Sequence, residues 1–338
     1  MISSVLIIVP HQDDDLNIAG CLLDQMIKAR IHISVCFVTN GDYDAKELTR
    51  SHEVKKVAKI FDYEKVYYLG YGDGGINKES LYYASDYNTI VCSHSGYSET
   101  HGVGEYSDFH YELYGNHAPY TKNNLRSDIK DICLKIKPDL IFCVAGDSHP
   151  DHKLVSELFD EALELIIRET DFRPLVLKKF AYLGIWHGPD DYFSIEAKET
   201  ECIDSKNNEI VTTCSPYIWE QRLRFSVSHD MYNLFFLKSK LFKAYRMYKS
   251  QSGAAFFSRC CNIDATYWFY NTMTKSIGLL EDFPIDETPF SLFENRIGQK
   301  RSALKCYVFK YCYDIYVFLF YNIPGKIKQI IERGFKFK

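Results

Sequence analysis

The sequence lacks the short motifs that mark nucleotide and disulfide chemistry. It contains no G-x-G-x-x-G string and no Walker P-loop, so it does not predict a dinucleotide or nucleoside triphosphate site. Its 11 cysteines are odd in number and scattered, without a C-x-x-C pair. Buried thiols in a reducing cytosol are therefore a better expectation than a disulfide framework.

Long apolar runs and low-complexity segments are missing as well. No stretch of roughly 18 or more uncharged apolar residues occurs, which argues against a membrane-spanning helix. The apolar residues 1–9 have no basic leader and no small-residue cleavage site, so we expect a strand there rather than a signal peptide. Because linkers and internal repeats are also missing, we expect one main domain with a tail.

The first 190 residues alternate between short apolar runs and amphipathic segments, which is an α/β pattern. Strands are expected at 5–9, 31–38, 65–69, 140–144 and 180–186, and helices at 16–27, 45–60, 125–136, 154–167 and 238–249. Residues 75–120 break the pattern and are rich in Tyr, Ser, Gly and His. Since this stretch is too long for a plain connection, we expect a functional loop region whose tyrosines either stack on a ligand or pack together.

Two polar strings follow two of the expected strands. The string P-H-Q-D-D-D occupies residues 10–15, and G-D-S-H-P-D-H occupies residues 146–152. Because parallel strands present their chemistry at their carboxyl ends, the two strings can converge in one crevice. Imidazole and carboxylate ligands in that position suit zinc with an open coordination site.

Each string taken alone has a simpler explanation. A lone histidine at a strand end is usually satisfied by a backbone carbonyl, and an Asp triplet before a helix usually serves as a cap. A second string with a His-x-x-His pair and an internal Asp is harder to explain by capping, and it favours a metal site. A magnesium phosphohydrolase remains an alternative because hard cations prefer carboxylates, although it does not need three histidines.

The two strings together resemble those of the LmbE-like, or PIG-L-type, zinc-dependent N-deacetylases. That family commonly shows (A/P)-H-P-D-D-E and D-x-H-P-D-H. The second motif is matched in full, whereas the first departs at Gln12, in place of proline, and at Asp15, in place of glutamate. The resemblance covers about residues 1–270 and includes Arg50, Glu53, Asp73 and, more weakly, Tyr248-Lys249-Ser250-Gln251, Tyr267 and Trp268.

The resemblance implies a fold and a metal. The fold is a Rossmann-like three-layer sandwich with a mostly parallel sheet in residues 1–275, followed by a C-terminal helical extension in residues 276–338. The metal is Zn²⁺, or another divalent cation, with His11, Asp14 and His152 as ligands.

The resemblance also implies a division of catalytic roles. Asp13 would be the general base, and His149, oriented by Asp151, would stabilise the oxyanion. Zinc lowers the pKa of bound water to about 7 and polarises the acyl oxygen, while an adjacent carboxylate can carry the proton to the amine. Successive residues that enter a helix point in different directions, so we expect only one of Asp13 and Asp14 to face the metal.

The family acts on N-acetylated amino sugars, alone or in glycoconjugates, so we expect a substrate of this kind here, either free or linked to a nucleotide or a lipid. The positions matching Arg50 and Asp73 lie close to the sugar in relatives. Two alternatives remain open: Arg50 and Glu53 can pair along a helix, and Asp73 between glycines can shape a turn. A non-catalytic sugar-binding protein on the same fold also stays open, because Gln12 and Asp15 depart from the family pattern.

The C-terminal segment differs from the rest in charge. Residues 300–338 hold nine Lys and Arg against two acids, a net of +7, whereas the whole chain is at −5. Interleaved aromatics suit docking on an anionic bilayer, with the protein cytoplasmic and peripheral at the inner face of the membrane. The alternative is a helical hairpin packed on the main domain. Nucleic acid is not an expected partner, since the α/β part lacks basic clusters with interleaved aromatics.

Overall fold

The central sheet is mostly parallel. The computed structural model describes residues 2–43, 45–75, 78–181, 192–193, 202–204, 209–260, 264–272, 276–277 and 301–322. The strands of the sheet are β1 (Ser4–Val9), β2 (His32–Thr39), β3 (Lys65–Tyr71), β4 (Leu140–Val144), β5 (Leu175–Lys179), β10 (Leu223–Ser226), β11 (Asp264–Asn271) and β12 (Ser276–Ile277). They are arranged in the order β10-β11-β5-β4-β1-β2-β3, with β12 beside β11. Strands β1 to β5 pair in parallel, and β11 is antiparallel to β5, β10 and β12.

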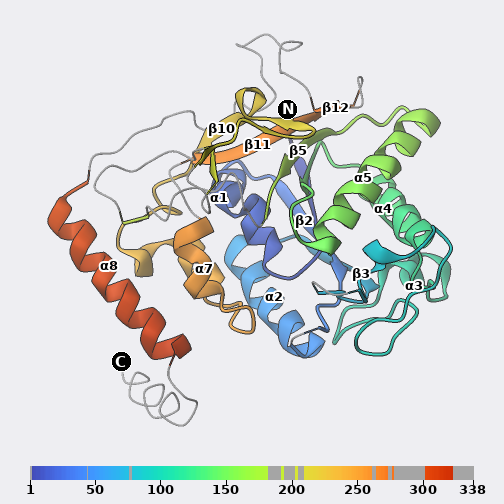
Figure 1. Cartoon of the computed structure of the whole chain (residues 1–338), viewed down its shortest axis with the longest axis horizontal. Coiled ribbons are helices and arrows are strands. Elements are labelled where there is room, and N and C mark those ends of the chain that lie inside the picture. Colours follow the sequence, from blue (N-terminus) through green and yellow to red (C-terminus); the bar gives the residue numbers. More distant parts are fainter. Residues whose placement is uncertain are drawn as a thin grey trace.

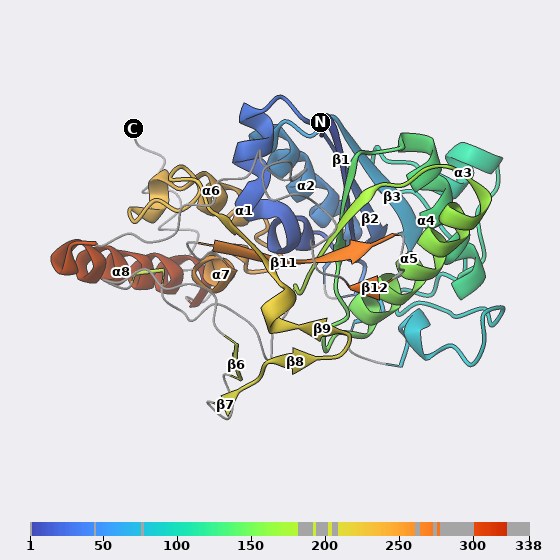
Figure 2. The same ribbon diagram turned by 90° about the horizontal axis from the view of Figure 1, so that it is seen from above.

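Helices cover both faces of this sheet. They are α1 (Asp14–Lys28), α2 (Glu47–Phe61), α3 (Phe109–Tyr114), α4 (Lys122–Ile136), α5 (Pro150–Glu169), α6 (Lys240–Tyr245), α7 (Gly253–Cys260) and α8 (Ala303–Val317). Helices α4 and α5 lie on one side, and α1, α2 and α6 lie on the other (Figures 1 and 2). Two short hairpins, β6 (Ile203–Asp204) with β7 (Glu209–Ile210) and β8 (Thr213–Cys214) with β9 (Tyr217–Ile218), lie outside the sheet. The expected three-layer α/β fold is confirmed.

The sequence explains why the central elements form where they do. Strands β1 and β4 are continuous apolar runs because helices bury both of their faces. Helix α5 begins with Pro150 in its first turn, where a missing N–H group costs no hydrogen bond, and residues 146–149 therefore precede the helix directly. The strand order reverses between β1 and β4, and both polar strings follow these two strands.

Eight of the expected elements are confirmed, namely strands 5–9, 31–38, 65–69 and 140–144 and helices 16–27, 45–60, 125–136 and 154–167. Of the strand expected at 180–186, residues 180–181 are not in a strand, and residues 182–186 lie outside the described ranges. The sequence pattern does not predict β5, which ends at Lys179. Its pattern was obscured by Lys178, which is fully buried and forms an ion pair with Asp160.

The long helix expected at 238–249 is also wrong. Helix α6 is only six residues long, begins where the Ser239 side chain accepts the N–H of Phe242, and ends at Tyr245. The chain then folds back, and Gly253 approaches the Tyr245 carbonyl so closely that a Cβ atom there would lie 2.3 Å from it. Helical periodicity does not reveal this close approach.

The C-terminal helix α8 packs one face against the domain (Figure 1). The ring of Phe309 contacts Phe235, and the hydroxyl group of Tyr313 donates to the Ala254 carbonyl at 2.7 Å. The alternative in which the C-terminal segment packs on the main domain therefore accounts for the inner face of α8. Residues 273–275, where the domain boundary was expected, and residues 323–338 lie outside the described ranges. Of the helices that the structure describes, none combines the length and apolarity needed to cross a bilayer.

Residues 75–120, called the irregular region below, pack on the end of β3, where closely spaced glycines allow a close approach. A Cβ atom at Gly72 would lie 2.3 Å from the Ser93 Cβ, and one at Gly74 would lie 2.1 Å from the Ser80 Cα. Among the residues of this region that the structure describes, only the turn Leu81–Tyr83 and α3 are helical, which confirms its expected irregular character. The glycines allow the region to cover the carboxyl end of the sheet.

We expect Gly74→Ala to lower the free energy of unfolding by about 1–3 kcal/mol, because the Ser80 backbone must move to admit the methyl group. Chemical denaturation measures the change. The matched control is Gly146→Ala, where the new Cβ meets atoms only at 3.6 Å or more and a change within about 0.5 kcal/mol is expected. Equal effects of the two substitutions would contradict this account of the packing.

Candidate active site

Three loops meet at the carboxyl ends of β1, β3 and β4. The loop after β1 carries His11 and leads into α1 at Asp14, and the loop after β4 carries His149 and leads into α5 with His152. The loop after β3 supplies Asp73, whose carboxylate lies 3.5 Å from His11. The structure therefore brings the two polar strings together at the reversal of strand order, where open α/β sheets bind ligands.

The carboxylate of Asp14 lies between two imidazoles. Its Oδ2 atom is 3.2 Å from Nδ1 of His11 and 3.3 Å from Nε2 of His152, and all three side chains are buried. The other oxygen, Oδ1, accepts the side-chain amide of Asn17 at 3.2 Å, and Asn17 in turn accepts the Tyr245 hydroxyl. The position of Asp14 is thus fixed from the side of α1 and α6.

The far nitrogen of each imidazole lies against another carboxylate. Nε2 of His11 is 3.0 Å from Oδ2 of Asp151, and Nδ1 of His152 is 2.8 Å from Oδ2 of Asp147. Histidines that bind metals commonly donate their second ring N–H to a carboxylate, which fixes the tautomer and turns the free nitrogen toward the ion. Both histidines show this arrangement, with the inner nitrogen facing Asp14.

These residues fit a zinc ion. Zinc binds histidine nitrogen and carboxylate oxygen at about 2.0–2.2 Å in a tetrahedron, so neighbouring ligand atoms lie about 3.3 Å apart. The two distances from Asp14 match that spacing. His149 lies beside this pair, since single ring nitrogens of His11, His149 and His152 are all within 4.8 Å of one another.

A second group, His11 with Asp73 and Asp151, also has ligand atoms within 4.8 Å. Its carboxylates already accept several donors. Asp151 accepts the Gly74 N–H and the Ser80 hydroxyl, and Asp73 accepts the Gly75 N–H and lies 3.3 Å from Arg50. Their oxygens are therefore better placed to hold His11 than to bind a cation.

The site attracts positive charge because carboxylates outnumber cations in it. Burial alone would lower the pKa of His152, but the carboxylates of Asp14 and Asp147 raise it to about 9. Burial would raise the pKa of Asp14, yet His152 and His11 hold it well below its usual range. A divalent cation between these groups would supply the positive charge that the carboxylates favour.

Asp13 is buried in a strained backbone conformation. Its φ of 119° is one that side chains rarely adopt, and such strain often marks a functional residue. Burial and the neighbouring Asp14 carboxylate raise its pKa well above the usual value. A carboxylate that holds a proton more tightly is a better base near neutral pH, which suits the role expected for Asp13.

The histidine at the mouth of the site, His149, is held by a backbone group. Its Nδ1 accepts the N–H of Asp151 at 3.2 Å, so Nε2 carries the hydrogen and can donate it. Burial, reinforced by the charges of His11 and His152, lowers the pKa of His149 to about 4 and keeps it neutral. The expected orienting role of Asp151 is therefore played by its backbone, while its carboxylate serves His11.

Arg50 bridges three parts of the site. Its guanidinium lies 3.3 Å from Asp73, donates to Gln12 at 3.3 Å and donates to Gln251 at 2.6 Å. The alternative pairing of Arg50 with Glu53 is wrong, because Glu53 instead accepts the N–H and hydroxyl of Ser250. The turn alternative for Asp73 holds in part, since its Oδ1 accepts the Gly75 N–H.

Sequence reasoning missed several supporting residues. Asp147 stands in the second motif, which assigns it no role, and Ser80 carries no signal because it lies in the irregular region. The two departures from the family motif have local partners: Gln12 donates to the Thr39 carbonyl at 2.7 Å, and Asp15 accepts the hydroxyls of Tyr63 and Tyr248. Burial raises the pKa of Asp15 to about 6 against the effect of these two bonds.

Comparison with protein families decides the identity of this region. The PIG-L family, described as GlcNAc-PI de-N-acetylase, matches residues 6–163, which include both polar strings, Arg50 and Asp73. Residues 6–163 are a PIG-L family domain. A search among curated proteins finds no match.

Solved structures resemble the chain at low sequence identity. The N,N'-diacetylchitobiose deacetylase of Pyrococcus horikoshii is 16% identical, with 83% of this chain and 88% of that chain covered and a TM-score of 0.47. A deacetylase in the biosynthesis pathway of teicoplanin is 17% identical, with 79% and 97% covered and a TM-score of 0.45. A conserved protein of Thermus thermophilus is 19% identical, with a TM-score of 0.35, and the match covers 53% of this chain and just under two thirds, 66%, of that one.

We expect Asp14→Asn to weaken zinc binding by the PIG-L domain more than about 100-fold, since losses of 10- to 100-fold are typical even for residues that only support a ligand. Asp13→Asn is the matched control and is expected to change the affinity less than about tenfold. Competition with a fluorescent zinc chelator measures both values. Loss of zinc with Asp13→Asn and its retention with Asp14→Asn would reverse the two roles.

Proposed function

We propose that this protein is a zinc-dependent hydrolase that removes the N-acetyl group from an N-acetylated amino sugar, either free or in a nucleotide- or lipid-linked conjugate. The observation that carries the proposal is the position of Asp14 Oδ2, within 3.3 Å of the inner nitrogens of both His11 and His152, inside a PIG-L domain. The description of the family, GlcNAc-PI de-N-acetylase, supports N-acetylglucosamine-type substrates.

The chain's own residues divide the reaction between them. His11, Asp14 and His152 would hold zinc, which when bound supplies a Lewis acid and lowers the pKa of water to about 7. Asp13 takes a proton from the attacking water and later gives it to the amine nitrogen as the C–N bond breaks, which leaves acetate and a free amine. The Nε2–H of His149 donates to the oxyanion, and Arg50 and Asp73 bind the sugar.

Neither alternative function gains support from the geometry. A magnesium site is expected to consist of oxygen ligands, whereas Asp14 lies between two imidazole nitrogens. The departures at Gln12 and Asp15, which suggested a non-catalytic protein, each have hydrogen-bond partners and leave the proposed ligands and base in place.

We expect the zinc-loaded protein to release acetate from at least one N-acetylated amino sugar in a panel of free, nucleotide-linked and lipid-linked compounds. Asp13→Asn should lower kcat by about 10²- to 10⁴-fold while zinc content stays constant, because positioned proton transfer contributes that much. Asp171→Asn, on the exposed turn after α5, is the control and should retain full activity. Sugar binding without acetate release would favour the non-catalytic alternative instead.

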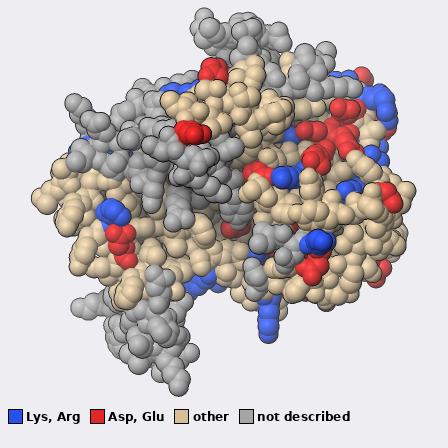
Figure 3. All heavy atoms as spheres, in the orientation of Figure 1, with Lys and Arg blue, Asp and Glu red and all other residues tan. Residues whose placement is uncertain are grey.

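We also propose that the outer face of α8 docks on an anionic lipid surface. This face presents apolar and aromatic side chains at helical spacing, each 40–74% exposed: Leu304, Tyr307, Val308, Tyr311, Ile315 and Phe318. The surface over α8 is mostly uncharged in Figure 3. Lys305 and Lys310 lie on the same helix, and the net charge of +7 on residues 300–338 is complementary to anionic headgroups.

Sedimentation with vesicles tests this docking. We expect the protein to bind vesicles containing anionic phosphatidylserine and to lose at least about tenfold in affinity when Tyr307 and Tyr311 are replaced by Ser. Ile90→Ser, an exposed apolar residue of the irregular region, is the control and should leave binding unchanged. Failure to bind anionic vesicles, or a dimer whose contact is abolished by the α8 substitutions, would overturn the proposal.

A further inference from the structure

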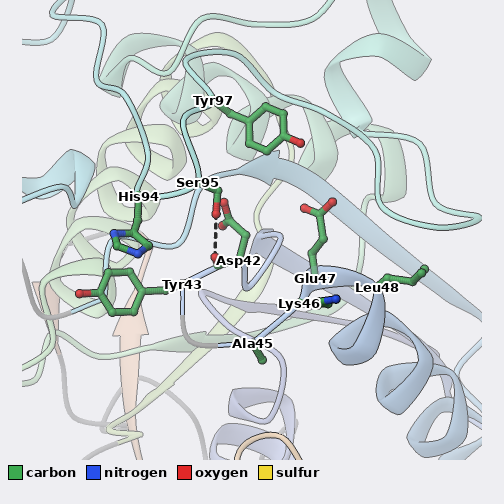
Figure 4. Close-up of a pocket in the computed structure, with 9 residues that line it drawn as sticks. All are labelled: Asp42, Tyr43, Ala45, Lys46, Glu47, Leu48, His94, Ser95 and Tyr97. Carbon is green, nitrogen blue, oxygen red and sulfur yellow. Dashed lines mark hydrogen bonds between the residues drawn. The ribbon is translucent and has the colours of Figure 1, made fainter.

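The structure has an open pocket of about 660 Å³ (Figure 4). Its walls come from the segment between β2 and the first turn of α2 and from a tight turn of the irregular region. The lining residues are Asp42, Tyr43, Ala45, Lys46, Glu47, Leu48, His94, Ser95 and Tyr97. Ligand pockets commonly have volumes of about 300–1,000 Å³, so this one has room for more than a single small group.

Asp42 and Tyr43, which line the pocket, connect it to Asp73 of the active site. The N–H of Asp73 donates to the Asp42 carboxylate at 2.8 Å. The ring of Tyr43 packs against Gly75 so tightly that a Cβ atom there would lie 2.9 Å from it, and Gly75 donates to Asp73 at 2.9 Å. Asp73 in turn lies 3.5 Å from His11. A substrate bound at the active site therefore has this pocket as its immediate neighbour.

Hydrogen bonds and a stacked pair of rings hold the walls of the pocket in place. The hydroxyl of Ser95 donates to the Asp42 carbonyl at 2.7 Å, which ties the turn to the loop after β2. The ring of Tyr97 stacks on His101, with centroids 3.9 Å apart, and Nε2 of His101 lies 2.9 Å from Glu47. The pocket is thus built before a ligand arrives.

The lining combines aromatic faces with acceptors for hydroxyl groups. Figure 4 shows Tyr43 and His94 on one side, with Tyr97 and Glu47 on the other. Oδ2 of Asp42 is buried and has no hydrogen-bond partner in the described part of the chain, and a buried acceptor without a donor is costly. Apolar ring faces with several hydroxyl donors around their edge are the features of a pyranose, which matches this lining.

We propose that this pocket holds the sugar ring next to the acylated one, so that the preferred substrates contain at least two linked sugars. This inference rests on the proposed function for the identity of the neighbouring ring. Asp42 and Glu47 accept hydroxyl groups of the second ring, and Tyr97 stacks on one of its faces. The irregular region thereby selects the length of the substrate, while the PIG-L motifs carry out the reaction.

Calorimetric titration of the zinc-loaded protein tests the pocket without turnover, with glucosamine and its β-linked disaccharide, both without acetyl groups, as ligands. We expect the wild-type protein to bind the disaccharide about tenfold or more tightly than the monosaccharide, the size of one good aromatic contact. Tyr97→Ala should reduce this preference to about threefold or less, and Tyr97→Phe should keep it. Tyr111→Ala, an exposed tyrosine of α3, is the control and should also keep it.

The outcomes separate the pocket from the proposed reaction. Equal affinities for the two sugars in the wild-type protein, or a preference that survives Tyr97→Ala, would contradict the proposed site for the second sugar, whether or not acetate is released. A preference lost in Tyr97→Ala, together with no acetate release from any acylated sugar, would support the pocket and contradict the proposed function.

Discussion

The structure depends on holding several carboxylates and imidazoles close together in a buried place. Asp14 lies between His11 and His152, and Asp151 and Asp147 hold the outer nitrogens of these two rings. Buried charges are costly unless they are paired and hydrogen-bonded, so each group needs its neighbours. This requirement explains why the loops after three strands converge so tightly at one edge of the sheet.

The rest of the fold supplies the supports for this cluster. Glycines at the end of β3 let the irregular region approach, which brings Ser80 to Asp151 and the turn 93–97 to Asp42. From the other side, the segment after α6 brings Gln251 to Arg50 and Ser250 to Glu53. Segments far apart in the sequence thus hold the same site, and the PIG-L motifs alone would not position it.

The spacing of apolar residues predicted the strands and helices whose burial follows a regular period. The polar strings at the ends of two strands predicted where His11, Asp14 and His152 would meet. The apolar pattern failed at β5, where the polar residue Lys178 is buried in an ion pair with Asp160 of α5. It also failed where the chain folds back after Tyr245. The motifs predicted which side chains meet, but not that the backbone of Asp151 holds His149 or that Arg50 pairs with Asp73. Such contacts depend on tertiary register, which spacing along the chain does not encode.

Everything proposed for this site requires that His11, Asp14 and His152 surround one cation. Anomalous X-ray diffraction from a crystal of the zinc-loaded protein tests it most directly. We expect one strong zinc peak about 2.0–2.2 Å from a carboxylate oxygen of Asp14 and from the ring nitrogens of both histidines that face it. A peak held instead by His11, Asp73 and Asp151, or no peak at this end of the sheet, would rule out this set of ligands.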